Sequence, residues 1–291
     1  MENLADRLFP FFQALKDAPG RFFGKDGLKR ASYVAFSMIL AIFPFCILVL
    51  SVAVLFSTNQ ITQNYGSLED LLNVVFGSWP DEIARPIETE VRAVLQNSGR
   101  STVTVGALLT LLLASNGFEA VREVLSEAYR EDDPRPIWKK RLVAVAFAMG
   151  GAVFVTVSGV LGVLVPVYLA YVSDALPVLH LDLVTSEIMA RLVTVGFLFF
   201  GLIAMHKWLP GLRWPVRSVL PGVLLTMVLW AVCASGFDYY IRTFSNYSMT
   251  YAGLAGVMTA LIFMYLMSAV LVFGAEYNAR LDELRGGHPS E

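Results

Sequence analysis

The stretch ASYVAFSMILAIFPFCILVLSVAVLFS, from Ala31 to Ser57, decides the fold class of this 291-residue chain. It contains no charged residue and is longer than the roughly 20 apolar residues that an α-helix needs to cross a bilayer. It is too long for the apolar region of a secretory signal, and it ends in the polar residues STNQITQN rather than in a small-residue cleavage site. The stretch therefore predicts a membrane-spanning helix.

Apolar runs of this kind recur along the chain, at about 31–57, 102–118, 142–172, 189–209, 217–237 and 251–277. The composition agrees, because 56% of the residues are hydrophobic and only 16% are charged, against about a quarter charged in a soluble domain. The sequence shows no internal repeat and no disordered linker. We predict an all-α, polytopic membrane bundle of six transmembrane helices, a single integral membrane domain over residues 1–291.

The basic residues indicate the orientation of these spans, because cytoplasmic loops of membrane proteins are enriched in lysine and arginine. With six spans, 17 of the 22 lysines and arginines fall on the side that holds both termini. The other side keeps five arginines: Arg85, Arg92, Arg100, Arg191 and Arg242. We expect both termini in the cytoplasm.

Segments outside the spans also show helical periodicity. Run 102–118 is the shortest span, and we expect its helix to continue into the cytoplasm through FEAVREVLSEAYR, where apolar residues form a stripe. The acidic connection 57–101 predicts one or two outer amphipathic helices, with apolar residues at Ile83, Ile87, Val91, Val94 and Leu95.

The N-terminal residues predict a further amphipathic helix, with its apolar residues at Leu4, Leu8, Phe11, Phe12 and Leu15. Two interpretations of this helix stay open. It lies in the membrane interface, or it packs as a plain cytoplasmic helix.

Motifs of catalysis and energy coupling are missing from the sequence. It contains no GxxxxGK[ST], HExxH or GxSxG pattern. Its three histidines lie far apart, so we expect no metal ion, no cofactor and no enzyme activity. A single histidine at a membrane boundary, such as His206, is expected to be an interface residue. The net charge of -2 gives no support for a nucleic-acid partner.

Polar residues inside the apolar runs are then the informative ones, because hydrocarbon is a costly environment for them. In the first span, Tyr33, Ser37 and Pro44 lie on one helical face, and Pro44 removes a backbone hydrogen bond. This face lines a cavity or a substrate path, or the kink is simply packed against a neighbouring helix. Asn116 is expected to form a hydrogen bond across helices, and Glu119 to lie near the headgroups.

The last span closes with Glu276 and Asn278 at its inner boundary. We consider Glu276 either an ionisable gate or the partner of Arg280 or of the basic residues Lys139–Arg141. The small residues Gly253, Gly256 and Ala260 predict a helix-packing face in the same span.

Several of these segments resemble the YihY/BrkB family of bacterial inner-membrane proteins, over nearly the whole chain. The resemblance is carried by ASYVAFSMILAIFPF (31–45), by ASNGFEAVREVLSEAYR (114–130) with RPIWKKRL (135–142), and by KWLPGLRWPVRSVLPG (207–222) with YAGLAGVMTALIFMYLMSAVLVFGAEYNARL (251–281). The sequence departs from the family pattern at Tyr251–Gly253 and at Tyr277. The resemblance implies a six-span fold and a location in the bacterial inner membrane. Some members have carried a ribonuclease label, for which these residues offer neither a metal-ligand cluster nor a basic groove.

Two interpretations of function follow from the sequence. The first is translocation or handling of a lipid or other amphipathic envelope molecule, because a kinked helix carries a polar face and no energy-coupling motif is present. The second is a non-transporting scaffold or envelope assembly partner that docks another protein on the helix and loop of residues 119–141. The expected partners are membrane lipids, and an envelope protein or a second copy of the chain is a further option.

Overall fold

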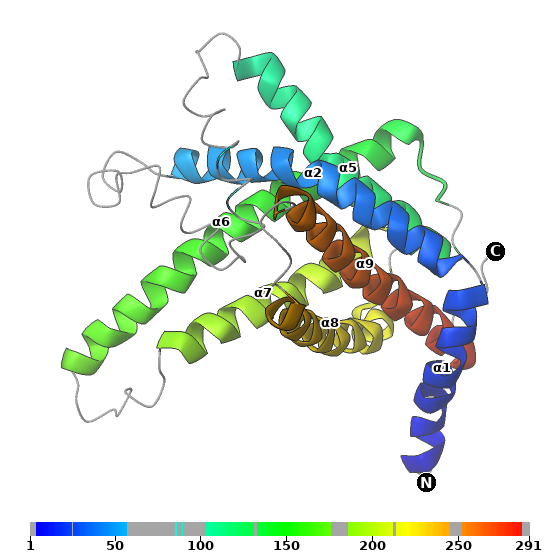
Figure 1. The fold of residues 1–291 in the computed structure, drawn as a ribbon. Helices are drawn as coiled ribbons and strands as arrows, with labels where there is room; N and C mark the ends of the chain where they lie inside the picture. Colours follow the sequence, from blue (N-terminus) through cyan, green and yellow to red (C-terminus); the bar gives the residue numbers. More distant parts are fainter. Residues whose placement is uncertain are drawn as a thin grey trace. The chain divides into compact units, whose positions relative to one another are not determined.

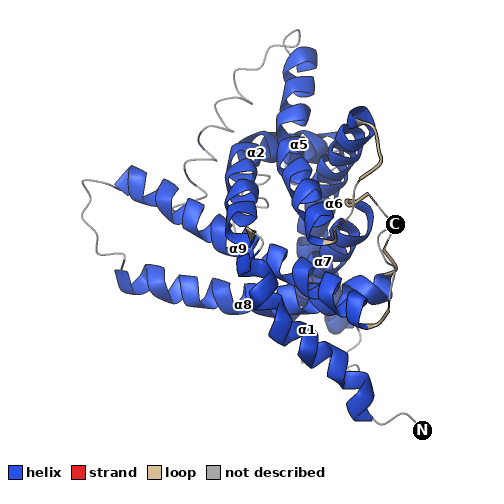
Figure 2. Ribbon diagram, turned by 90° about the vertical axis from the view of Figure 1, so that its right-hand side faces the viewer, coloured by secondary structure: helices blue, strands red, loops and turns tan. Residues whose placement is uncertain are grey.

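The structure is a computed structural model that describes residues 4–24, 26–56, 85, 89, 103–130, 133–175, 186–211, 214–244 and 252–286. Within these residues all regular secondary structure is α-helical (Figure 2), which confirms the predicted fold class. In chain order the helices are α1 (Leu4–Gly24), α2 (Gly27–Phe56), α5 (Val103–Ala128), α6 (Ile137–Ala175), α7 (Ser186–Trp208), α8 (Val216–Phe244) and α9 (Ala252–Leu284) (Figure 1).

Five segments of these helices are long and apolar enough to cross a membrane, as judged from the described residues. They are Gly27–Val49, Ile137–Leu161, Arg191–Trp208, Val216–Ile241 and Gly256–Leu284. Each overlaps one of the predicted runs, so the chain is a multi-pass helical membrane protein. Run 102–118 falls within α5 but is not among the five segments. The count of six spans therefore stays a prediction.

The helix that contains run 102–118 continues well beyond it. α5 ends at Ala128, and Arg130 then adopts a left-handed conformation with φ 58°. Such a residue is a common way for a helix to end. The predicted outer helices, by contrast, fall in residues 57–101, of which the structure describes only Arg85 and Thr89, so that prediction lies outside the described residues.

Contacts divide the chain into two compact units, and α2, α5, α6 and α7 each contribute a segment to both. The first unit comprises Met1–Ile42, Ser115–Val145 and Leu202–Glu291. In this unit α9 packs against both α8 and α1. The indole Nε1 of Trp230 donates a hydrogen bond of 2.8 Å to the carbonyl of Met267, and the rings of Phe237 and Phe263 lie 5.2 Å apart, which joins α8 to α9.

The second unit comprises Phe43–Ala114 and Ala146–Gly201. Here the hydroxyl of Thr156 on α6 bonds its own helix at Ala152 (2.9 Å) and reaches the carbonyl of Val49 on α2 at 3.4 Å. The rings of Phe154 and Phe197 lie 4.0 Å apart and join α6 to α7. Pro44 is buried in this unit, and α2 continues through it as one helix.

Large apolar side chains on the outer faces of the helices are exposed, as expected of helices that face lipid. On α8, Leu224, Val228 and Val232 are spaced four residues apart and are all exposed. This spacing puts them on one face of the helix. An exposed apolar stripe would be unfavourable in water, but it suits a hydrocarbon environment.

Candidate functional site

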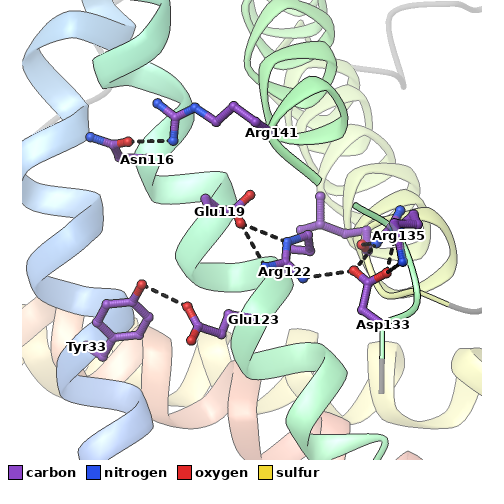
Figure 3. A network of polar contacts seen from close by, with 9 residues as sticks. Tyr33, Asn116, Glu119, Arg122, Glu123, Asp133, Arg135 and Arg141 are labelled. Carbon is purple, nitrogen blue, oxygen red and sulfur yellow. Dashed lines mark hydrogen bonds and ion pairs between the residues drawn. The ribbon is translucent and has the colours of Figure 1, made fainter. Parts of the chain in front are cut away.

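The polar side chains that the sequence singles out lie mostly in the first unit, and one group of them joins α2, α5 and α6 (Figure 3). On α5, Asn116, Glu119 and Glu123 follow each other at intervals of three and four residues, so they share a helical face. From α2, the hydroxyl of Tyr33 donates a hydrogen bond of 3.0 Å to Oε2 of Glu123. We call Tyr33, Asn116, Glu119 and Glu123 the polar stripe.

The polar stripe also reaches the first turns of α6. Nη1 of Arg141 donates a hydrogen bond of 2.8 Å to Oδ1 of Asn116, which gives Asn116 a bond across helices of the kind expected for it. Tyr33, Asn116 and Glu123 are exposed, whereas Ser37, one turn from Tyr33 on α2, is half-buried. The stripe is therefore an open surface.

Glu119 connects the stripe to a buried arginine. Nε and Nη2 of Arg122 donate hydrogen bonds of 3.1 and 2.7 Å to Oε1 of Glu119, and Nη1 donates one of 2.9 Å to Asp133. Burial alone would lower the pKa of Arg122, but the bond to Glu119 and the charges of Glu119 and Asp133 outweigh it and raise that pKa. Arg122 is thus held in its charged form.

Asp133 anchors the connection between α5 and α6. Its carboxylate accepts hydrogen bonds from the backbone amide of Arg135 (3.0 Å) and from two guanidinium nitrogens of the same residue, each at 2.8 Å. Burial would raise the pKa of Asp133, yet these bonds and the charge of Arg135 hold it below its ordinary value. Arg135 also donates a bond of 2.8 Å to the carbonyl of Leu209 at the end of α7. The loop is therefore fixed to a second helix.

Glu276 on α9 is the most deeply buried carboxylate of the candidate residues, with 1% of its surface exposed. Its Oε1 lies 3.1 Å from Nη1 of Arg30 on α2, and its Oε2 lies 3.4 Å from Nε of Arg21 on α1. The partners suggested by the sequence, Arg280 and the residues Lys139–Arg141, are therefore replaced by Arg30 and Arg21. Local spacing favours Arg280, but the packing of α1 on α9 brings a distant arginine closer.

These arginines extend the contacts into a wider ion-pair network. Arg21 pairs with Glu283 at 2.8 Å, Arg130 with the same carboxylate at 2.8 Å, and Arg280 with Asp17 at 2.8 Å. Arg30 pairs additionally with Glu127 on α5 at 2.8 Å. The network thus joins α1, α2, α5 and α9.

Asn278, two residues after Glu276, is completely buried and connects three segments. Its Nδ2 donates to the carbonyl of Val219 (2.8 Å) and to the hydroxyl of Tyr129 (3.2 Å), and its Oδ1 accepts a bond of 2.6 Å from the amide of Gly222. The hydroxyl of Tyr129 lies 2.7 Å from Nδ1 of His206. The expectation that His206 is an interface residue is wrong, because this side chain is 0% exposed.

A close contact between α9 and α8, which the sequence did not indicate, lies at Gly274. A Cβ atom added to Gly274 would overlap the hydroxyl of Thr226 and lie 3.0 Å from the carbonyl of Gly222 on α8. Gly256 and Ala260 of the predicted packing face are partly buried, and the side-chain surroundings of Gly253 lie outside the described residues. The pair Gly222–Gly274 was missed, although both glycines stand in segments that carry the family resemblance.

The contacts of these groups are hydrogen bonds and ion pairs. Within the described ranges, His, Cys, Asp and Glu side chains nowhere gather in a group of three or more that could hold a metal ion. The polar stripe offers a phenol, an amide and two carboxylates, and the separate ion-pair network is centred on the buried carboxylate of Glu276.

The five long apolar helical segments define the class of the protein, a polytopic helical protein of the membrane. The chain belongs to the family described as Virulence factor BrkB, whose model matches residues 18–291. It is 25% identical to the ribonuclease-like protein YfkH of Bacillus subtilis, over 92% of this chain and 94% of that protein.

Two further relatives carry only the description UPF0761 membrane protein. The chain is 28% identical to the one from Tolumonas auensis, over 69% of this chain and 68% of that protein. It is 26% identical to one from Rhodospirillum centenum, over 99% of this chain and 61% of that protein. No solved structure matches the chain.

Proposed function

We propose that this protein lies in the bacterial inner membrane, with both termini in the cytoplasm, and that it moves or handles a lipid or another amphipathic envelope molecule. The proposal concerns binding and passage, and it assigns no catalytic step to any residue. The ribonuclease-like name of YfkH describes that protein, and we do not transfer it to this chain.

The observation that carries the proposal is the polar stripe within an apolar surface. Tyr33, Asn116 and Glu123 are exposed, and the same helices expose Phe36 and Leu40 on α2 and Leu142 on α6. Tyr33 and Asn116 belong to the apolar runs 31–57 and 102–118, where exposed polar groups are unfavourable against hydrocarbon alone. A molecule with a polar headgroup and apolar chains would match both kinds of side chain at once.

The orientation is supported by the placement of basic residues. Arg122 bonds Glu119 of the polar stripe, and Arg141 bonds Asn116. Positively charged residues near the ends of spans favour the cytoplasmic side. The polar stripe, which contacts these two arginines, would then lie toward the cytoplasmic leaflet.

The test is transbilayer movement of a headgroup-labelled fluorescent phosphatidylethanolamine in proteoliposomes, with dithionite as the membrane-impermeant quencher. The protein should make lipid from the inner leaflet accessible to dithionite faster than in protein-free vesicles. The double variant Asn116→Leu, Glu123→Gln should slow this movement, and Ser235→Ala, an exposed position on α8, should not. Equal rates with and without protein would remove the proposal.

The alternative of a scaffold that docks an envelope protein has one observation in its favour. Ile137 and Trp138, at the start of α6, are 86% and 63% exposed, and they follow directly on the loop anchored by Asp133. Crosslinking from Trp138 that recovers one stoichiometric partner, together with no lipid movement in vesicles, would favour this alternative.

A further inference from the structure

One face of α1 forms ion pairs with α9, and the opposite face exposes large apolar side chains. Ala14, Asp17, Ala18 and Arg21, at intervals i, i+3, i+4 and i+7, form the face toward α9. Phe9, Phe12, Lys16 and Phe23, at intervals i, i+3, i+7 and i+14, form the opposite face. We call this second set the outward face. A surface helix in water normally buries its apolar residues and exposes its charges.

The inward face is fully engaged by α9. Ala14 and Ala18 pack in one cluster with Tyr277 and Leu281. Asp17 pairs with Arg280, and Arg21 pairs with Glu283 and Glu276. The position and rotation of α1 are therefore fixed by apolar packing and by ion pairs together, so the outward face has a defined direction.

The outward face is strongly apolar. Its three phenylalanines, Phe9, Phe12 and Phe23, are 65%, 70% and 67% exposed. Lys16 is its one charged residue, and this side chain too is exposed. We propose that this face lies in the headgroup region of the bilayer and binds the lipid surface of the leaflet in which α2 begins.

The connections of α1 place it at a membrane boundary. α1 ends at Gly24, and the first membrane-crossing segment begins only three residues later, at Gly27. The corner is tight, because Asp26 has a left-handed φ of 59° and a Cβ on Gly27 would lie 2.5 Å from the carbonyl oxygen of Phe22. The other attachment of α1, through Tyr277, Leu281 and Glu283, is to the last turns of the final membrane-crossing segment. Both attachments thus lie at the ends of spans.

The residue types of the outward face fit a lipid surface better than a protein partner. Aromatic rings with one lysine are typical of helices that lie in the interface, with their apolar face about 5–10 Å below the headgroup boundary. A lysine on such a face extends its ammonium group toward the phosphates while its methylene chain stays in the apolar region. The face has no carboxylate among its four residues, which favours contact with anionic lipids.

The inference is tested by measuring the depth of fluorescent labels in the full chain. Single cysteines replace Phe12 or Phe23 in a Cys46→Ala, Cys233→Ala background, with Pro134→Cys in the exposed α5–α6 loop as control. The labelled proteins are reconstituted into vesicles of phosphatidylethanolamine and phosphatidylglycerol. Quenching is then compared between nitroxide-bearing lipids and aqueous iodide. Size-exclusion profiles identical to that of the cysteine-free protein show that each variant folds.

Labels at residues 12 and 23 should be quenched by the lipid-borne nitroxide and protected from iodide, and the label at residue 134 should show the opposite pattern. If the labels at 12 and 23 are quenched by iodide as readily as the label at 134, the inference is wrong. It is equally wrong if they are protected from both quenchers and the Phe12→Cys protein crosslinks to a second copy, because the face would then be a dimer interface. Lipid movement need not change in any of these outcomes.

Discussion

Arg30 on α2 and Glu276 on α9 form an ion pair of 3.1 Å although 246 residues separate them in the sequence. The carboxylate side chain is only 2% exposed, and a second arginine, Arg21, approaches it from α1. Removing one partner of a buried ion pair leaves an uncompensated charge, which costs about 3–5 kcal/mol in well-buried cases. Glu276 therefore pairs with two arginines from different helices, and each of them has a second, more exposed partner, Glu283 or Glu127.

The first prediction follows from this arrangement. Glu276→Gln leaves Arg21 and Arg30 facing each other without their shared carboxylate, so it should lower the free energy of unfolding by about 2–4 kcal/mol. The measurement is the midpoint of thermal unfolding in detergent, followed by tryptophan fluorescence.

Glu127→Gln is the matched control for Glu276→Gln, because Glu127 is the other partner of Arg30 but has a side chain that is 48% exposed. An exposed pair contributes about 0–1 kcal/mol, so the control should unfold close to the wild-type temperature. Equal losses in the two variants would show that burial of Glu276 has no special effect.

The second prediction concerns Asn278. Asn278→Ala leaves the amide of Gly222 and the carbonyl of Val219 without their side-chain partner in a buried site. Each of the three hydrogen bonds of Asn278 contributes about 0.5–1.5 kcal/mol, so the variant should unfold at a clearly lower temperature than wild type. Ser235→Ala, which removes an exposed hydroxyl bonded to its own helix, should have little effect. A small loss for Asn278→Ala would mean that water replaces the amide.

Features that depend on neighbouring residues could be predicted from the sequence, whereas contacts between residues far apart in the chain could not. Apolar length and spacing predicted the helices around 31–57 and 142–172, because a span is a local property of consecutive residues. The same reasoning indicated that Glu276 needs a partner but not which one. Spacing favoured Arg280, one turn away, but the packing of α1 on α9 and the reach of Arg30 from α2 make Arg21 and Arg30 the partners.

Local patterns also predicted the candidate site residues only in part. Asn116 and Glu119 could be recognised as polar groups at the end of an apolar run, and Tyr33 as one on the first span. Their convergence on a stripe with Glu123 depends on how α2 lies against α5, which no local pattern reports. The glycine pair of α8 and α9 was missed for a related reason. Gly222 can be recognised as a packing position only when the neighbouring backbone of α9 is known.

The third prediction is a pH dependence that comes from Asp133. Its pKa is below the ordinary 3.8 in the folded chain, so the stabilisation by this carboxylate is complete above about pH 4 and is lost as the pH falls through the lowered pKa. Asp133→Asn should therefore unfold at a lower temperature than wild type at pH 7, and the difference should shrink toward pH 3. The measurement is the unfolding midpoint of both proteins across this range.

Asp26→Asn serves as the control for that series. Asp26 is exposed and pairs with Lys29 at 2.8 Å, and asparagine tolerates the left-handed backbone of this position. Its unfolding midpoint should follow that of wild type at every pH, because an exposed pair contributes little. A difference between wild type and Asp133→Asn that stays constant from pH 7 to pH 3 would show that the carboxylate charge is not what stabilises the loop.

The last prediction tests the close contact of α8 and α9. Gly274→Ala places a methyl group against the hydroxyl of Thr226, so it should destabilise the chain by about 1–3 kcal/mol. Adding Thr226→Ala removes that hydroxyl and should recover most of the loss, leaving the carbonyl of Gly222 as the remaining close neighbour. Gly236→Ala, on α8 but with no atom within 4 Å of the new methyl group, should be neutral or slightly stabilising, because alanine favours a helix by about 0.5–1 kcal/mol over glycine. If Gly274→Ala behaves like Gly236→Ala, the two helices do not approach as closely as the structure indicates; recovery in the double variant would locate the contact at Thr226.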